Sequence, residues 1–338
     1  MRHVIFALAL ILAPLRLTAF ELEDFHRFDA AEETAALKVI STADMQIFRP
    51  LIVAFQARNP GVAIEYTVAS STELMKAIYE EGAAFDLAIS SAMDLQTKLA
   101  NDGLARTHLS DATQTLPEWA RWRDQVIAFT QEPAAMIVSA EAFDGLDRPE
   151  TRADLVALLR ANEARFRGRI GTYDIRASGL GYLFATQDSR QSESYWQLME
   201  AFGRLDARLY CCSGDMIDGV LSGQLAFAYN VLGSYARRRL TTEDGAEVLL
   251  LSDFTNVMLR SALIPSNAAN WRTAGDLIDF LVSDAPSMAG ALPPPLIAGS
   301  ASDDALRPIS FGPELLVFLD GLRRKNFLSV WTRSLEQP

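Results

Sequence analysis

Between residues 37 and 99, short apolar segments alternate with amphipathic ones. Leu37 to Ile40, Val62 to Val68 and Phe85 to Ile89 have the length and apolar composition of strands. The segments that follow each of them place apolar residues at helical spacing. Strand, helix, strand, helix and strand with brief loops predict a parallel sheet with crossover helices. Ligands of such sheets bind beyond the carboxyl ends of the strands.

The stretch from Gly168 to Tyr182 repeats this design in the second half of the chain. It predicts a strand over Arg169 to Thr172, a polar turn with Arg176, and a helix that begins at Ser178. Free N–H groups at a helix start, with an arginine beside them, suit an anion. Any one such serine is explained by capping its own helix. Five or six of them at strand ends in both halves favour a ligand cleft between two lobes.

The length of 338 residues favours two lobes. The apolar segment from Gln125 to Ser139 is interrupted at Glu132 and Pro133, which predicts a crossover between them. We assign residues 38–131 and 256–338 to lobe 1 and residues 132–255 to lobe 2. Residues 20–37 are acidic and are expected to form an irregular leader.

The first residues have the layout of a secretory signal. Arg2 and His3 precede an apolar run from Val4 to Leu12, and cleavage is expected after Ala19. A retained anchor and a buried helix are the alternatives. Removal of residues 1–19 leaves 29 of the 31 basic residues against 43 acidic ones, a net charge of −14. Such a chain is not expected to bind nucleic acid.

Residues suited to catalysis or to metal ligation are scarce. Two histidines, His26 and His108, remain after residue 19, and no G-x-S-x-G motif is present. We therefore expect no enzyme, no cofactor and no metal-ligating cluster. Cys211 and Cys212 are adjacent and cannot join distant segments. We expect buried thiols on a strand, with a vicinal disulfide as the alternative, and no zinc site.

Four segments resemble a family of known proteins. They are VISTADMQIFRPLIVAFQARNPGVAIEYTVASSTEL (Val39 to Leu74), FDLAISSAMDLQTKLANDGLA (Phe85 to Ala105), GTYDIRASGLGYLFATQD (Gly171 to Asp188) and FAYNVLGSYA (Phe227 to Ala236). They are similar to periplasmic solute-binding proteins of ABC importers, in the group that includes ferric-iron and phosphosugar binders. The resemblance implies an α/β fold of two lobes, each a mainly parallel sheet flanked by helices. Crossover strands would hinge the lobes, which close on a ligand.

The resemblance also bears on the ligand. The related iron binders hold the metal with two consecutive tyrosines, a histidine and a glutamate. Here Tyr229 is followed by Asn230, and the loop after the first strand offers Ser41 and Thr42 with no histidine. This departure disfavours ferric iron and favours an oxyanion such as a phosphate ester, a phosphonate or a carboxylate.

We therefore expect an exported, monomeric receptor in the periplasm that delivers a small anionic solute to an ABC permease. The alternatives are a sensor for a membrane kinase, a ferric-iron binder and an enzyme on the same fold. By position, the expected ligand-binding residues are Ser41, Thr42, Ser70, Ser71, Ser91, Thr172, Arg176, Ser178, Ser213, Tyr229 and Asn230.

Overall fold

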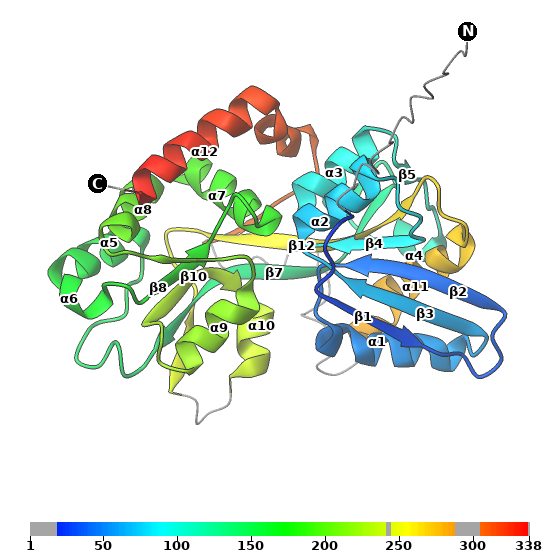
Figure 1. Cartoon of the computed structure of the whole chain (residues 1–338), viewed down its shortest axis with the longest axis horizontal. Coiled ribbons are helices and arrows are strands. Elements are labelled where there is room, and N and C mark those ends of the chain that lie inside the picture. The colour runs from blue at the N-terminus through cyan, green and yellow to red at the C-terminus, as the bar shows by residue number, and fades with distance from the viewer. Residues whose placement is uncertain (1–18, 241–244, 288–304, 337–338) are drawn as a thin grey trace, which may run out of the picture.

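The computed structural model describes residues 19–240, 245–287 and 305–336. Two α/β lobes lie side by side and are connected by the long strands β7 (Val126–Ser139) and β12 (Thr255–Pro265) (Figure 1). The expected signal sequence lies outside the described residues, apart from Ala19. Within the described ranges, no helix is long and apolar enough to cross a membrane.

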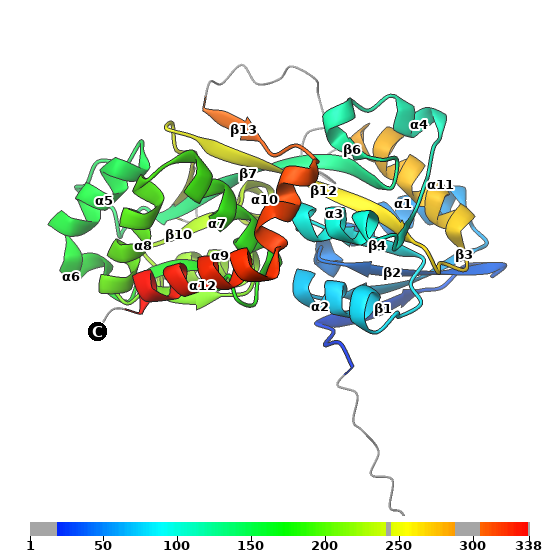
Figure 2. The same cartoon turned by 90° about the horizontal axis from the view of Figure 1, so that it is seen from above.

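Lobe 1 contains the described residues before β7 and the returning helices α11 and η3. Its strands are β1 (Asp24–Phe28), β2 (Ala35–Ser41), β3 (Val62–Val68), β4 (Leu87–Ser90), β5 (Ala105–Arg106) and β6 (Arg121–Trp122). Its helices are α1 (Met45–Arg58), α2 (Ser71–Met75), η1 (Lys76–Glu80), α3 (Met93–Asn101), α4 (Asp111–Gln114), η2 (Glu118–Ala120), α11 (Trp271–Ser283) and η3 (Ala285–Ser287). The helices α1 and α11 cover one face of the sheet, and α2 and α3 cover the other (Figures 1 and 2).

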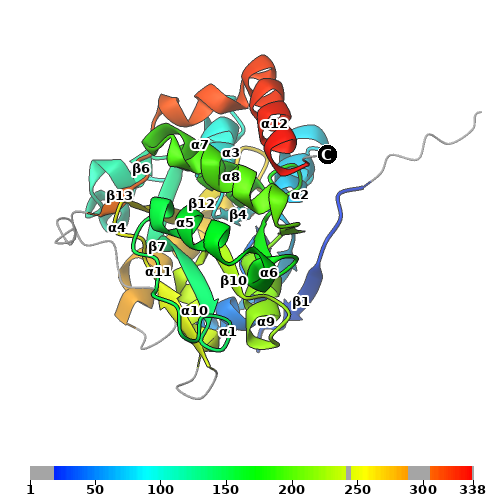
Figure 3. The ribbon, with the colours of Figure 1, turned by 90° about the vertical axis from the view of Figure 1, so that its left-hand side faces the viewer.

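Lobe 2 holds most of the second half. Its strands are β8 (Ile170–Tyr173), β9 (Arg208–Tyr210), β10 (Phe227–Leu232) and β11 (Ala246–Leu249). Its helices are α5 (Arg152–Ala161), α6 (Glu163–Phe166), α7 (Gly179–Gln191), α8 (Ser194–Arg204), α9 (Ser213–Leu221), α10 (Gly233–Arg239) and α12 (Gly321–Leu335). In Figure 3, α7, α8 and α12 lie on one side of β10, and α9 and α10 lie on the other.

One continuous sheet runs through both lobes, in the order β1-β3-β2-β4-β12-β7-β10-β8-β9. Within lobe 1, β2 is parallel to β3 and to β4, as the sequence predicts. Within lobe 2, β8 is parallel to β10 and to β9. The crossover strands β7 and β12 are antiparallel to each other, with Val257 opposite Pro133 and Ala262 opposite Ile127. The α/β fold expected from the sequence is therefore confirmed.

Alternation along strands divides the core between the two faces of the sheet. Val39 and Ile40 on β2 are both fully buried, yet Val39 packs in the cluster under α1 and α11 while Ile40 packs in the cluster under α2 and α3. Helix α1 contains Pro50 in its interior, and its apolar face is buried at Phe48, Leu51 and Phe55.

Two expectations about chain organisation differ from the structure. The leader is not irregular throughout, because Asp24–Phe28 pairs antiparallel with β3 and forms an edge strand. The final helix α12 was assigned to lobe 1 by residue number, yet it packs on α8 of lobe 2 (Figure 3). Phe327 and Trp331 supply its buried face. The short helix η4 (Pro313–Leu319), which precedes it, contacts α3 of lobe 1.

Candidate functional site

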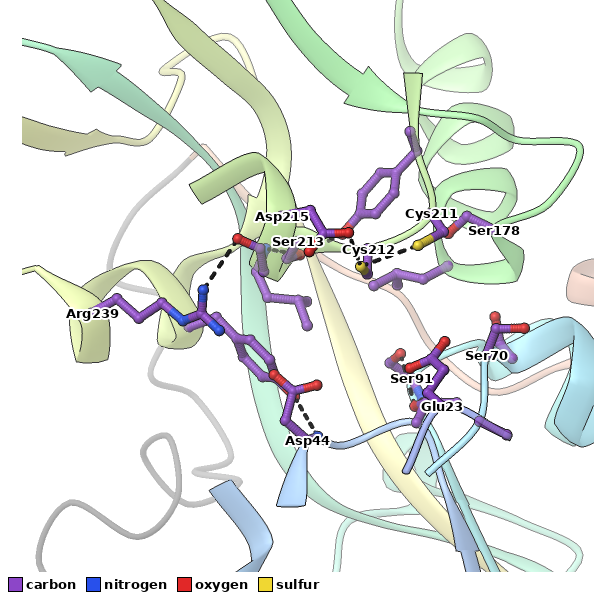
Figure 4. A pocket seen from close by; sticks show the side chains of 18 residues that line it. Glu23, Asp44, Ser70, Ser91, Ser178, Cys211, Cys212, Ser213, Asp215 and Arg239 are labelled. Carbon is purple, nitrogen blue, oxygen red and sulfur yellow. Dashed lines mark hydrogen bonds between the residues drawn. The ribbon is translucent and has the colours of Figure 1, made fainter. Parts of the chain in front are cut away.

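A cavity of about 380 Å³ lies between the two lobes. Its walls come from the loops that follow the strands of both lobes (Figure 4). The lining residues are Glu23, Thr42, Asp44, Ala69, Ser70, Ser71, Ser91, Tyr173, Ser178, Leu180, Cys211, Cys212, Ser213, Gly214, Asp215, Leu232, Tyr235 and Arg239. The cavity thus occupies the position that the parallel strands predict.

Six of the eleven residues expected from the sequence line this cavity. They are Thr42, Ser70, Ser71, Ser91, Ser178 and Ser213. Several of them also organise the polypeptide around the cavity. The Ser70 hydroxyl accepts a hydrogen bond from the Glu73 amide (3.2 Å), and the Ser178 hydroxyl accepts one from the Gly181 amide (3.1 Å). The two roles considered for each serine, helix cap and cavity wall, therefore coincide at Ser70 and Ser178.

Hydrogen bonds across the cleft hold the lobes together at the rim of the cavity. The Gly179 amide of lobe 2 donates to the Ser71 hydroxyl of lobe 1 (3.0 Å). The Thr72 hydroxyl donates to the carbonyl of Ala177 (2.9 Å). On the floor, the Asp44 amide donates to the Tyr235 hydroxyl (3.3 Å). The described arrangement is therefore one in which the two lobes are in contact.

Carboxylates dominate the charge of the cavity. Glu23 and Asp44 belong to lobe 1 and Asp215 to lobe 2 (Figure 4). Burial, followed by the charges of Asp44 and Asp215, raises the pKa of Glu23. Burial also raises the pKa of Asp44, against the opposing effect of Arg239. Arg239 is the cationic residue among the described lining residues, and it pairs with Asp218 (2.5 Å).

Arg176, the expected anion ligand, does not line the cavity. Its guanidinium pairs with Asp174 (2.8 Å) and Glu336 (3.1 Å), and it lies over the ring of Trp331. Both carboxylates raise the pKa of Arg176, and Asp174 has the larger effect. Arg176 therefore ties the turn after β8 to the C-terminal helix.

Thr172, Tyr229 and Asn230 also lie apart from the large cavity, around a cavity of about 10 Å³ inside lobe 2. The hydroxyl of Tyr229 and the amide of Asn230 both donate to the buried carboxylate of Asp188, at 2.7 and 2.8 Å. Arg152 is buried beside them, donates to the Tyr229 hydroxyl (2.7 Å) and pairs with Asp188 (3.5 Å). Tyr229 therefore belongs to a buried polar network inside lobe 2 and not to the wall of the large cavity.

Ser41 is fully buried at the end of β2 and does not line the cavity. Its hydroxyl accepts a hydrogen bond from the Ala43 amide (3.0 Å). This bond shapes the turn that brings Thr42 and Asp44 to the cavity wall.

The cysteines are not the buried strand thiols that the sequence predicts. Both are free; Cys211 is exposed and Cys212 is half-buried. They follow β9 rather than lie on it, and Cys212 is the N-cap of α9. One donor atom from each of Cys211, Cys212 and Asp215 lies within 4.8 Å of the other two. No such group was expected from the sequence, in which Cys211 and Cys212 were considered only as buried thiols or as a vicinal disulfide.

Sequence reasoning assigned none of the four charged lining residues, Glu23, Asp44, Asp215 and Arg239, to the site. Asp44 shares a loop with Thr42, so its position carried a usable signal. Arg239 ends a basic run that is equally typical of an exposed helix end. Glu23 precedes a strand whose pairing is long-range, so no local pattern identifies it.

Comparisons with known proteins agree with this architecture. The family model of bacterial extracellular solute-binding proteins matches residues 37–287. No curated protein matches the chain significantly. The crystal structure of the substrate-binding protein of an ABC transporter from Agrobacterium tumefaciens is 31% identical, with a TM-score of 0.86; 92% of this chain and 98% of that one are covered.

Two more distant structures share the fold. Iron-bound HitA from Pseudomonas aeruginosa is 17% identical (TM-score 0.68), with 89% of this chain and 99% of that chain covered. The periplasmic binding protein AfuA from Actinobacillus pleuropneumoniae, with fructose-6-phosphate bound, is 12% identical (TM-score 0.70), with 90% and 100% covered. The chain belongs to the bacterial extracellular solute-binding proteins, the non-catalytic receptors of ABC transporters.

Proposed function

We propose that this receptor captures a small solute that carries a positively charged group and delivers it to the permease of its ABC transporter. The observation that supports this proposal is the set of three carboxylates, Glu23, Asp44 and Asp215, in one cavity. Arg239 is the opposing charge among the described lining residues, and Asp218 already pairs with it. The side chains of the cavity therefore favour a cation.

The pKa shifts point the same way. Burial and neighbouring carboxylates disfavour the ionised forms of Glu23 and Asp44, which raises the pKa of each. A cationic group between the carboxylates would relieve their repulsion and stabilise the ionised forms. We therefore expect the affinity for a cationic solute to fall as the pH is lowered and these carboxylates become protonated.

A solute with an anionic group is the second candidate. Helices α7 and α9 both begin at the cavity, and the hydroxyls of Ser70, Ser91 and Ser178 line it. Helix starts and hydroxyl donors favour phosphate esters, phosphonates and carboxylates. Arg176 does not contribute to this candidate, because it is paired outside the cavity.

Thermal unfolding of the protein in the presence of small compounds separates the two candidates. The set contains ammonium compounds, phosphate esters, phosphonates and carboxylates of matched size, together with zwitterions and ferric iron. A compound at 100 times its Kd should stabilise the protein by about 2.7 kcal/mol. Stabilisation by ammonium compounds or zwitterions supports the first candidate. Stabilisation by anions alone would refute it and support the second.

A charge-neutral variant tests the role of the carboxylates directly. The substitution Asp44→Asn removes a charge-assisted contact between the carboxylate and the cationic compound. Such a contact contributes about 1.5–3 kcal/mol, so the affinity should fall roughly ten- to hundredfold. The matched control is Asp144→Asn, which removes the same charge from an exposed position outside the cavity lining. Equal effects of the two substitutions would show that only the net charge of the protein matters.

A further inference from the structure

Two thiols and a carboxylate meet at the start of helix α9, on the lobe 2 wall of the cavity (Figure 4). The Cys211 and Cys212 sulfurs are 3.2 Å apart, and the Cys212 sulfur is 3.2 Å from Oδ2 of Asp215. Cys212 is the N-cap and Asp215 is the third residue of the helix, the two positions whose side chains approach each other at a helix start. The local fold therefore holds all three groups together.

Two hydrogen bonds link the three side chains of this cluster, and none of the three side chains carries a positive charge. Cys211 donates to Cys212, and Cys212 donates to the Asp215 carboxylate. Deprotonation of both thiols would place three anionic donor atoms within 4.8 Å of one another, an arrangement that requires a cation.

We propose that Cys211, Cys212 and Asp215 form a binding site for one soft divalent metal ion, of the class of Zn²⁺ and Cd²⁺. Thiolates select soft metals, and zinc takes thiolate and carboxylate ligands in a tetrahedral arrangement. Binding exchanges the two thiol protons for the metal ion, which is then held by two sulfurs and one carboxylate oxygen. The fourth position would face the cavity and is open to water or to a solute.

The spacing of the donors suits this chemistry. Two sulfurs bound to one zinc at about 2.3 Å lie roughly 3.8 Å apart in a tetrahedron. The sulfurs, now 3.2 Å apart, would therefore separate by about half an ångström on binding. Cys211 is exposed, so it can make this adjustment without moving the core.

The surroundings add to the attraction for a cation. Glu23 faces the cluster from lobe 1, so its carboxylate adds a further negative charge on the other wall of the cavity (Figure 4). Arg239, the last residue of α10, pairs with Asp218 of α9 and also donates to the carbonyl of Gly214 (3.2 Å). This proposal goes beyond the proposed function, because lobe 2 side chains alone would ligate the metal whatever the charge of the transported solute.

A cadmium titration of the reduced protein tests the site. We expect one equivalent of Cd²⁺ to bind, with thiolate-to-cadmium charge-transfer absorption in the ultraviolet and the release of two protons. Protein first loaded with Zn²⁺ should lack this absorption and gain it on addition of Cd²⁺, because the softer ion displaces Zn²⁺ from thiolates. Cys211→Ser and Cys212→Ser should each lower the affinity at least 100-fold, and Asp215→Asn at least tenfold.

The matched control is Asp218→Asn, which removes the same charge one turn further along α9 but outside the cluster. It should change the affinity for Cd²⁺ less than threefold. Thermal unfolding of each variant without metal should match that of the parent protein, which separates loss of ligation from loss of fold.

Three results would overturn the proposal. One is binding of Cd²⁺ without the charge-transfer absorption, and another is equal affinity in the Cys211→Ser/Cys212→Ser double variant. The third is a thiol titration that finds no free thiol in protein isolated from its oxidising compartment, because a vicinal disulfide would then occupy the site. If the double variant loses Cd²⁺ binding but still binds ammonium compounds, the metal site and the solute site are independent of each other.

Discussion

A methyl group added at Gly179 should force the lobes apart without unfolding either of them. Gly179 begins α7 in lobe 2, and its amide donates to the Ser71 hydroxyl of lobe 1. A Cβ atom at this position would lie 2.6 Å from that hydroxyl oxygen and 2.9 Å from Cδ1 of Leu95, also in lobe 1. Since ordinary contact begins at about 3.4 Å, the Ser71 hydroxyl and the Leu95 side chain would have to turn aside, and Cβ of Ser71, at 3.1 Å, would still have to move away by about 0.3 Å.

The cost of Gly179→Ala falls on the form in which the lobes touch. Overpacking of this kind costs about 1–3 kcal/mol, and the hydrogen bond to Ser71 would be weakened as well. If ligand binding requires contact between the lobes, the Kd for the compound identified in the screen should rise roughly 5- to 150-fold. Hydrogen exchange should accelerate around Gly179 and Ser71 but not in the crossover strands.

Substitutions at two other glycines serve as controls for this experiment. Gly321→Ala adds the same methyl group at a helix start where nothing lies within 4 Å, so it should leave affinity and stability unchanged. Gly181→Ala would place Cβ 2.3 Å from Cβ of Tyr173 inside lobe 2, so it should lower the unfolding temperature instead. Unchanged affinity and exchange in Gly179→Ala would refute the view that Gly179 and Ser71 touch in the ligand-bound form.

Three further predictions concern charged residues outside the cavity. Burial raises the pKa of Asp94 to about 7, so the folded chain keeps this proton between about pH 4 and pH 7 while the unfolded chain loses it. The free energy of unfolding should therefore fall by up to about 4 kcal/mol as the pH rises across that range. Urea unfolding at pH 5 and pH 8 should show this fall in the parent protein but not in Asp94→Asn. Arg176→Ala should leave solute affinity unchanged, because Arg176 is paired outside the cavity; a tenfold loss in calorimetry would return it to the site. Asp188→Ala should lower the free energy of unfolding by about 3–5 kcal/mol, because it leaves the Arg152 guanidinium buried with one partner fewer; denaturant unfolding measures this, and a change below 1 kcal/mol would contradict it.

Local patterns predicted the parts of the fold that local forces build. Val62–Val68 forms the predicted strand, and Ser178 caps the predicted helix. Both depend on neighbours within a few residues, so composition and spacing were enough. Strand β1 was missed because its pairing with β3 joins residues about 40 positions apart, and because it lies within the acidic segment 20–37.

The candidate site was predictable to the extent that backbone position alone determines it. The serines at strand ends reach the cavity because parallel strands end at one edge of a sheet. Arg176 also follows a strand end, yet Asp174, two residues before it, and Glu336, 160 residues after it, direct its side chain elsewhere. Side-chain direction at such positions depends on which partners compete for the charge, and one of the two here lies 160 residues away in the sequence.

The distribution of the carboxylates between the lobes bears on how binding and closure are coupled. Glu23 and Asp44 belong to lobe 1 and Asp215 to lobe 2, and the charge of Asp215 raises the pKa of both. Contact between the lobes therefore brings like charges together, which opposes closure in the absence of ligand. A cation between the two walls would attract both, so it would stabilise the closed form more than the open one. An anion would be held by helix starts and hydroxyls but would leave the repulsion between the carboxylates in place. The carboxylates would thus link the charge of the solute to the closure of the lobes.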